Sequence, residues 1–370
     1  MDLGDVVLLP GLVDAHCHLD YTAMAGKLPR PRSFPDWIKA IVALKASWTE
    51  ADFAASWQTG AGQLLRHGVT TVADVESFPA LLPRLWYTTP LRVLSFREII
   101  SLRSAVPPAH LAEAIETEWL RLPDGAGRFG LAPHAPYTTS GPVLDEVARI
   151  AQRRGWRLMT HVAESEAEFE MFMYRQGPLY DWLKSQRDMA DCGRGSPIAH
   201  LERFGYLDAN LIAVHVNYLA RDDARLLSRY GVHVVHCPRS HDYFRHLAFP
   251  RSELTAAGVN LCLGTDSLAS VRASGKARPE LSLFAEMALF ARNHPDVAPS
   301  DILAMVTLNP ARALGQTGII GELAPDSYAD LIVIPCRDGG DDPVSAVVAH
   351  EGPVSGVMVG GEWVVRPPGI

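Results

Sequence analysis

Two histidines separated by one residue stand near the start of the chain, in the stretch Pro10-Gly11-Leu12-Val13-Asp14-Ala15-His16-Cys17-His18. The apolar run before them, Val6 to Leu9 and then Leu12-Val13, predicts one buried strand. Side chains two apart on a strand point the same way, so His16 and His18 face one target. Neutral imidazoles suit zinc, iron or nickel, and the pair fits the first half of a metal site. For this motif alone, two hydrogen-bonded loop histidines are an equally good interpretation.

The elements that would place further ligands are apolar, β-branched runs alternating with helical stretches. After the first strand, strands are expected at 69–74, 91–96, 129–132, 157–160, 211–214, 233–235 and 260–263. The expected helices include 34–44, 50–66, 109–120, 142–152, 164–174, 220–229 and 279–292. These eight strand-then-helix units predict an α/β fold, a closed (β/α)8 TIM-type barrel. An open doubly wound sheet is the alternative, but no Gly-x-Gly-x-x-Gly follows a strand to support a dinucleotide site.

Beyond Ala313 the pattern changes to short apolar runs separated by Gly, Pro and Asp turns, with no helical stretch expected between them. The runs at 329–334, 344–348, 354–359 and 363–365 predict the strands of a small β-sandwich. We therefore expect two domains, a barrel over residues 1–315 and a small C-terminal β-domain over residues 316–370.

The composition narrows the class of partner. The 370 residues carry 34 Lys and Arg against 42 Asp and Glu, a net charge of −8, and contain no basic cluster that would favour nucleic acid or an anionic membrane. No apolar run is long enough for a membrane span, and no signal peptide is recognisable, so we expect a cytoplasmic protein with a small-molecule partner. Five cysteines without paired spacing argue against a disulfide framework or a cysteine-based zinc knuckle.

Polar residues close several of the expected strands, and in such a barrel the C-terminal strand ends carry the active site. The fifth strand ends at His161 and is followed by Glu164, the sixth ends at His215, and the eighth ends at Asp266 in Leu263-Gly264-Thr265-Asp266-Ser267. His215 or Asp266 alone is more often a hydrogen-bonded structural residue. Four histidines and a carboxylate at one end of a barrel favour a mononuclear metal site instead.

These motifs together resemble the amidohydrolase superfamily, and within it the deaminase and chlorohydrolase branch. The resemblance rests on the opening His-x-His segment, His161-x-x-Glu164, His215, Gly264-Thr265-Asp266-Ser267, and the closing runs 329–333 and 357–365. It covers nearly the whole chain. The branch includes S-adenosylhomocysteine, methylthioadenosine, guanine and aminodeoxyfutalosine deaminases.

The resemblance implies a role for each of these residues. His16, His18, His161 and Asp266 become the metal ligands, His215 lies beside the metal-bound water, and Glu164 transfers protons. Members with two metals carry a carboxylated lysine near the end of the fourth strand, where this chain reads Leu131-Ala132-Pro133-His134. One divalent ion is therefore expected, zinc first and iron second.

Substrate-contact candidates follow from loops on the catalytic side. His134 and Tyr137 lie in the segment that resembles the substrate-facing loop after the fourth strand, and Arg239 and His241 in the one after the seventh. His241 stands where several relatives have asparagine, which puts a simple transfer of adenosine or guanine specificity in doubt. Glu98, after the third strand, is a candidate for the hydroxyls of a ribosyl group.

The resulting hypothesis is a metal-dependent aminohydrolase that deaminates a purine-like base or nucleoside, such as aminodeoxyfutalosine or an adenosine derivative. A metal lowers the pKa of water, and Glu164 protonates the ring nitrogen, with Asp266 and His215 handling the water proton. The zinc deaminases with Pro-Cys-x-x-Cys form a different class, since no Cys-x-x-Cys occurs here. The alternatives are a chlorohydrolase or cyclic-amide hydrolase of the same superfamily, and a barrel that binds metal or nucleoside without turnover.

Family members usually begin with several strands that pair with the C-terminal β-structure, whereas His16 is close to Met1. We therefore expect a start assigned too late and an incomplete small domain. The sequence leaves the oligomeric state open, a homo-oligomer included.

Overall fold

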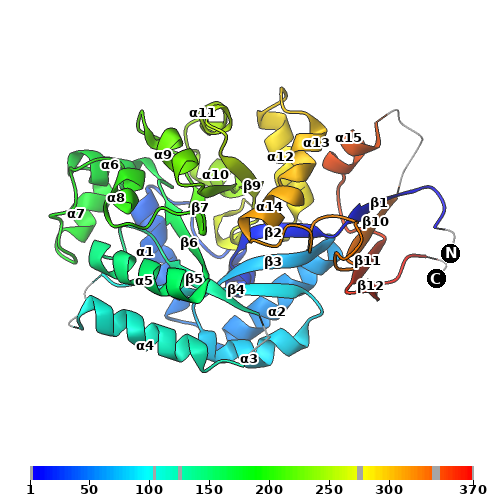
Figure 1. Ribbon diagram of the computed structural model, residues 1–370, viewed down its shortest axis with the longest axis horizontal. Coiled ribbons are helices and arrows are strands. Elements are labelled where there is room, and N and C mark those ends of the chain that lie inside the picture. The colour runs from blue at the N-terminus through cyan, green and yellow to red at the C-terminus, as the bar shows by residue number, and fades with distance from the viewer. Residues whose placement is uncertain (1–2, 103–105, 124–126, 273–277, 336–341, 369–370) are drawn as a thin grey trace.

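The computed structural model describes residues 3–102, 106–123, 127–272, 278–335 and 342–368 (Figure 1). Met1 and Cys336, on which two of the sequence expectations depend, lie outside these ranges. The other four cysteines, at positions 17, 192, 237 and 262, are free and buried. Among the described residues, no helix is both long and apolar enough to cross a membrane.

Eight parallel strands form the central sheet, in the spatial order in which they occur along the chain. They are β2 (Leu12–Cys17), β3 (Val69–Glu76), β4 (Arg92–Ile99), β5 (Arg128–Pro133), β6 (Arg157–Val162), β7 (Leu211–His215), β8 (His233–His236) and β9 (Asn260–Leu263). A bridge between Cys17 and Asp266 joins the first strand to the segment after the last, where the His18 N–H donates to the Asp266 carbonyl at 3.1 Å. The predicted (β/α)8 barrel is confirmed.

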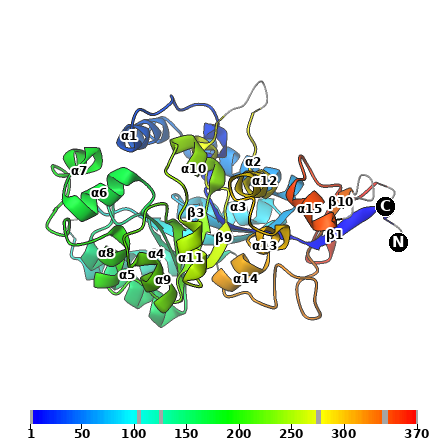
Figure 2. The same cartoon turned by 90° about the horizontal axis from the view of Figure 1, so that it is seen from above.

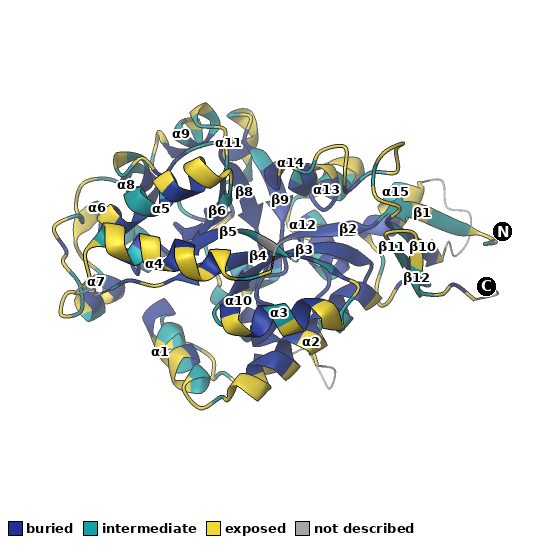
Figure 3. Cartoon of the chain, turned by 60° about the horizontal axis from the view of Figure 1, so that its bottom comes forward, coloured by how far each residue is buried: buried dark blue, intermediate teal, exposed yellow. Residues whose placement is uncertain are grey.

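Helices surround the barrel, and Figure 3 shows dark buried faces and yellow exposed faces on several of them. In the first half of the chain they are α1 (Phe34–Lys45), α2 (Glu50–Arg66), α3 (Leu82–Leu85), α4 (Pro108–Leu120), α5 (Gly141–Arg154), α6 (Glu166–Tyr174) and α7 (Pro178–Leu183). The second half contributes α8 (Pro197–Arg203), α9 (Asp223–Arg229), α10 (Pro238–Phe244), α11 (Arg251–Ala256), α12 (Leu283–Asn293), α13 (Pro299–Ala304) and α14 (Leu308–Ala313). Short 3-10 helices are η1 (Leu19–Met24), η2 (Pro79–Leu81), η3 (Trp86–Thr88) and η4 (Leu268–Ser270).

Capping residues shift the helix starts relative to the sequence expectation. The helix expected from residue 164 begins at Glu166, because the Ser165 hydroxyl accepts the N–H of Glu168 at 3.2 Å. Glu164 therefore lies in the turn between β6 and α6. In the same way Ser282 caps α12, so that helix begins at Leu283.

The single strand expected over Val6–Val13 is wrong, because the structure has two strands there. β1 (Val6–Pro10) pairs antiparallel with β10 (Leu331–Pro335), whereas β2 belongs to the barrel. The switch occurs at Gly11, where an added Cβ would lie 2.0 Å from the Thr70 hydroxyl oxygen. The N–H of Gly11 donates to Asp330 and that of Leu12 to Gly68, so neighbouring residues bond to different sheets.

β1, β10, β11 (Gly356–Val359) and β12 (Glu362–Val365) form a separate four-stranded antiparallel sheet in that order. The strand expected at 344–348 is wrong, because the chain forms a helix there, α15 (Pro343–Val348). Asp342 caps this helix, accepting the Val344 N–H at 3.0 Å, and Pro343 takes the first helical position. Val344, Val347 and Val348 have helical spacing, and the last two are buried.

Gly264 directly follows β9 and lies against His16 of β2. A Cβ at this position would lie 2.8 Å from the His16 carbonyl oxygen and 2.9 Å from Val235 Cγ1. We expect Gly264→Ala to lower the free energy of unfolding by about 1–3 kcal/mol, because backbone atoms must move to admit the methyl group. Thermal or urea unfolding measures this change.

Gly62→Ala is the matched control for this substitution. Gly62 lies inside α2 with no atom within 4 Å of an added Cβ, so alanine should leave stability unchanged or raise it. Equal stabilities of the two variants would contradict the close approach at Gly264.

Candidate metal centre and active site

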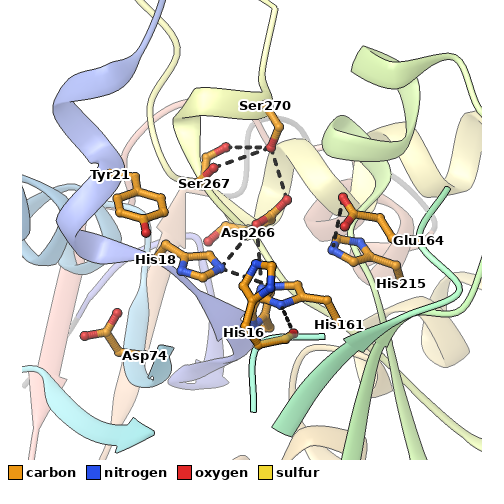
Figure 4. A network of polar contacts seen from close by, with 12 residues as sticks. His16, His18, Tyr21, Asp74, His161, Glu164, His215, Asp266, Ser267 and Ser270 are labelled. Atoms are coloured by element: carbon orange, nitrogen blue, oxygen red, sulfur yellow. Dashed lines mark hydrogen bonds and ion pairs between the residues drawn. The ribbon is translucent and has the colours of Figure 1, made fainter. Parts of the chain in front are cut away.

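Three histidines and one aspartate converge at the C-terminal end of the barrel. His16 lies on β2, His18 directly after it, His161 on β6 and Asp266 after β9, and one ligand atom from each lies within 4.8 Å of the others. The Nε2 atoms of His18 and His161 are 3.2 Å apart, and Asp266 Oδ1 lies 3.6 Å from His16 Nε2 and 3.8 Å from His18 Nε2. Figure 4 shows these atoms pointing toward one common centre.

Contacts of the outer Nδ1 atoms of His16 and His161 leave their Nε2 atoms, which face the centre of the group, free to coordinate a metal ion. His161 Nδ1 lies 2.8 Å from the carbonyl oxygen of His134, and His16 Nδ1 lies 3.1 Å from the sulfur of Met159. A proton on each of these outer nitrogens leaves Nε2 unprotonated on the inner side. His16 Nε2 is buried with no hydrogen-bond partner among the described residues. Three imidazoles and a carboxylate arranged in this way fit a divalent cation such as zinc.

The electrostatics keep the ligands in the forms that bind metal. Burial, helped by the neighbouring imidazoles, lowers the pKa of His18 to about 3 and that of His161 well below its usual range, so both rings are neutral. Burial alone would raise the pKa of Asp266, but the imidazoles of His16, His215 and His18 close to its carboxylate lower it well below its usual range. Neutral histidines and an ionised carboxylate are what metal binding requires.

Glu164 and His215 form a second pair beside the ligand group. Glu164 Oε1 lies 3.6 Å from His215 Nε2, and both side chains are buried. Burial, together with the neighbouring carboxyl groups of Asp266 and Glu168, raises the pKa of the Glu164 carboxyl well above its usual range. Burial likewise lowers the pKa of His215 to about 3. The pair is therefore a neutral carboxyl beside a neutral imidazole, and not a salt bridge.

The backbone is strained at several of the strand ends that supply this site. Ala163, His215, Val216 and Asp266 have φ values of 50°, 75°, 50° and 53°, a region that non-glycine residues rarely adopt. Such conformations persist where the surrounding structure holds them, and they concentrate at functional sites. Here they lie at the end of β7 or shortly after β6, β7 and β9, the strands that supply most of the group.

A cavity of about 250 Å³ opens onto these side chains. Its floor includes His18, His161, Glu164, His215 and Asp266. Its walls are largely apolar and come from α1, the end of β4 and the α7 segment: Trp37, Ile38, Ile41, Val42, Ile100, Leu102, Trp182 and Leu183. A wider groove of about 860 Å³ shares Leu102, Tyr137 and Thr138 with this cavity but contains none of the converging histidines.

The structure brings together some of the substrate-contact candidates and not others. Glu98, His134 and Tyr137 line the cavity. Arg239 is not among its lining residues, because its guanidinium bonds to the buried Glu286 and, at 2.8 Å, to the Glu280 carbonyl oxygen. His241 is also outside the lining and lies against His236, His246 and Phe249.

Sequence reasoning did not single out the cavity residues that come from helices, and three of them carry an indole ring or a charge. Trp37 and Lys45 are on α1, and Trp182 is on α7. No spacing rule sets them apart, because the strand pattern that locates the histidines says nothing about which helix covers the barrel mouth.

A family model and several relatives of known name match nearly the whole of this chain. The model of the Amidohydrolase family matches residues 7–364. A 5-methylthioadenosine/S-adenosylhomocysteine deaminase of Syntrophobacter fumaroxidans is 31% identical over 367 residues, covering 95% of this chain and 77% of the relative. The corresponding deaminase of Moorella thermoacetica is 30% identical over 349 residues, covering 91% of this chain and 75% of the relative.

Solved structures have the same fold. An adenosine deaminase from Xanthomonas campestris with bound zinc has a TM-score of 0.81 and 26% identity, covering 98% of this chain and 81% of that one. Helicobacter pylori aminofutalosine deaminase has a TM-score of 0.82 and 21% identity, covering 98% of this chain and 87% of that one. With the barrel and the converging side chains, the family match shows that this chain belongs to the Amidohydrolase family.

Proposed function

We propose that this protein is a metal-dependent hydrolase that deaminates the purine ring of an adenosine-type nucleoside and releases ammonia. The observation that carries the proposal is the convergence of His16, His18, His161 and Asp266 beside the Glu164–His215 pair, in one cavity. Relatives at 30% and 31% identity are deaminases of 5-methylthioadenosine and S-adenosylhomocysteine, and a zinc-bound structure at 26% identity is an adenosine deaminase. Zinc is therefore the ion that we assign to the four ligands.

The reaction needs a nucleophile at neutral pH and a proton on the ring. A bound divalent cation lowers the pKa of a water ligand to about 7 in favourable sites. Asp266 and His215 lie where they can take up or orient the proton of the attacking water. Glu164, neutral before the reaction, donates its proton to the ring nitrogen next to the attacked carbon and makes that carbon electrophilic. The C–N bond breaks once the water proton taken up by Asp266 or His215 has passed to the amino nitrogen, which leaves as ammonia. The remaining proton of the added hydroxyl returns to Glu164 as the ring C=O forms.

Glu168 helps to hold Glu164 in place. Its Oε2 accepts the backbone N–H of Glu164 at 2.9 Å, from the first turn of α6. Asn217 donates from Nδ2 to the Glu164 carbonyl oxygen at 2.9 Å. Both backbone polar groups of Glu164 are thus fixed by side chains, and its carboxyl is left directed at the cavity.

The other end of the cavity suits the sugar of a nucleoside. Glu98 is buried, and Ser77 donates a hydrogen bond to its Oε2 at 2.9 Å. His134 Nδ1 lies 2.8 Å from the Thr138 hydroxyl, which leaves Nε2 for a ligand. We assign Glu98 to the ribose hydroxyls and His134 and Tyr137 to the base or sugar.

The test is ammonia release by zinc-loaded protein from adenosine, 5-methylthioadenosine, S-adenosylhomocysteine and guanosine. We expect release from at least one of these nucleosides. Glu164→Gln should lower kcat by about 10²–10⁴-fold, because the amide cannot transfer the proton. Its zinc content, measured by atomic absorption, should remain one per chain, since Glu164 is not a ligand.

Glu166→Gln is the matched control, since Glu166 is exposed two residues further on. It should keep full activity. Zinc-loaded protein that releases no ammonia from any nucleoside, but does release chloride from a chlorotriazine, would contradict the deaminase proposal and favour the chlorohydrolase alternative.

The buried Glu168 predicts a pH dependence of stability. Burial raises its pKa from 4.5 to about 8, against the opposing N–H groups of Glu164, Ala163 and Ser165. Between these values the folded protein holds a proton that the unfolded chain releases, so stability falls as the pH rises. We expect the wild type to lose on the order of a few kcal/mol across this window, and Glu168→Gln to lose less.

Urea unfolding at about pH 5 and about pH 8 measures how much the free energy of unfolding changes with pH in the wild type and in Glu168→Gln. Other buried carboxyls also titrate in this window, so the informative quantity is the difference between the wild type and the variant. Glu166→Gln should behave like the wild type. If the slopes of all three proteins coincide, Glu168 is ionised in the folded state and the expectation is wrong.

A further inference from the structure

Lys45 brings a cation to the wall of the cavity. It is the last residue of α1 and one of the residues that line the cavity beside the converging histidines. Figure 2 shows α1 near α7 and α10. Lys45 lines the cavity, whereas Lys39 of the same helix is half exposed and pairs with Asp36.

The ammonium of Lys45 is hydrogen-bonded to two hydroxyls of the cavity wall. It donates to the Tyr21 hydroxyl, and to Ser77 Oγ at 3.3 Å. Ser77 in turn donates to Glu98 Oε2 at 2.9 Å. A lysine side chain carries three protons, so one remains for a ligand beyond these two described acceptors. Lys45 and Glu98 thus offer a donor and an acceptor on either side of Ser77.

Tyr21 links the same lysine to the ligand group. Its ring lies 5.1 Å from the His18 ring, centroid to centroid, with an interplanar angle of 3°, so the two rings are stacked. Lys45 Nζ also lies 4.6 Å from the centroid of the Tyr21 ring. The labelled Tyr21 and His18 in Figure 4 lie side by side. The lysine therefore contacts a side chain that packs directly on His18.

Lys45 also anchors one end of the helix that covers the cavity. Near its start, α1 packs through Phe34 and Trp37 on Phe244, and Trp37 Nε1 donates to the Ala269 carbonyl oxygen at 3.3 Å. At its end, Lys45 supplies hydrogen bonds to Tyr21 and Ser77. Between these two ends, Ile38, Ile41 and Val42 form part of the cavity wall.

We propose that Lys45 is a specificity-determining residue, which holds α1 over the cavity and forms with Glu98 a site for a vicinal diol. This inference rests on the proposed function and names the part of the substrate that the pair recognises. One hydroxyl donates to the Glu98 carboxylate, and the neighbouring hydroxyl accepts from the Lys45 ammonium. A ribosyl substrate satisfies both groups, whereas a dideoxyribosyl substrate would leave the third Lys45 proton and the remaining acceptor sites of the Glu98 carboxylate without a partner.

The charges support this pairing. Burial alone would raise the pKa of Glu98, but the Lys45 ammonium, with smaller effects from His134 and His18, lowers it to about 2. Glu98 is thus an anion near neutral pH and can only accept hydrogen bonds. A neutral side chain at position 45 would leave it as a buried carboxylate without its cation.

The experiment compares Lys45→Met, Lys45→Arg and the control Lys27→Met, each zinc-loaded. Lys27 is exposed and lies outside the cavity lining. With a ribonucleoside substrate, Lys45→Met should raise KM by about ten-fold or more while kcat changes by less than about three-fold, because a charged hydrogen bond in substrate binding is lost. KM for the 2′,3′-dideoxy form should change little. Lys45→Arg should recover part of the loss.

A second measurement does not depend on turnover. Hydrogen exchange of the 34–45 peptide should be faster in Lys45→Met than in the wild type, and close to the wild type in Lys45→Arg and Lys27→Met. Unchanged exchange in Lys45→Met would overturn the anchoring role even if no substrate is found. Equal KM changes for the ribosyl and dideoxyribosyl substrates would overturn the diol site. Both results leave the proposed function standing, which fails only if the wild type itself releases no ammonia.

Discussion

The convergence of buried lone pairs at the barrel mouth is the constraint on which the rest of this structure depends. Unprotonated imidazoles and a carboxylate repel one another when no proton or cation lies between them, and burial removes the water that would otherwise solvate them. His16 Nε2, fully enclosed and without a hydrogen-bond partner among the described residues, shows the difficulty most directly. A divalent cation at the centre would resolve it, and binding energy would then be coupled to folding energy.

The four candidate ligands must therefore be fixed by hydrogen bonds from neighbouring residues, and the Asp14 side chain makes several of these bonds. Asp14 accepts the N–H of Thr265 at 3.1 Å, its hydroxyl at 2.6 Å and the N–H of His16 at 3.3 Å. These bonds join the first barrel strand to the segment after the last one, directly behind two of the ligands. Ser270 adds a hydrogen bond to Asp266 Oδ2 at 3.1 Å, which orients Oδ1 toward the histidines. Outer contacts of this kind fix ligand direction in metal sites.

The barrel and its converging residues could be predicted from the sequence because both follow from local patterns. Each strand is a short apolar run, and His161, His215 and Asp266 come at or directly after such runs. The predicted strands were wrong in two places where a short apolar run fits more than one structure. The apolar run before His16 continues across Gly11, but its two halves bond to different sheets. Valines 344, 347 and 348 suit a strand by composition, and only the Asp342-Pro343 cap and their helical spacing mark α15.

The walls of the cavity could not be predicted in the same way, because their partners are distant in sequence. Arg239 follows a barrel strand and looks free to meet a ligand, yet Glu286 on α12 takes its guanidinium. No local pattern marks Lys45, the last residue of α1, yet its hydrogen bonds to Tyr21 and Ser77 place it in the cavity wall. The residues that converge on the metal site come from strand ends, whose position follows from the barrel. Much of the cavity wall comes from helices laid over the barrel mouth, where the helical pattern shows that one face is buried but not what it meets. The sequence therefore predicts the residues at the strand ends, which would carry the reaction, better than the wall residues that would select the substrate.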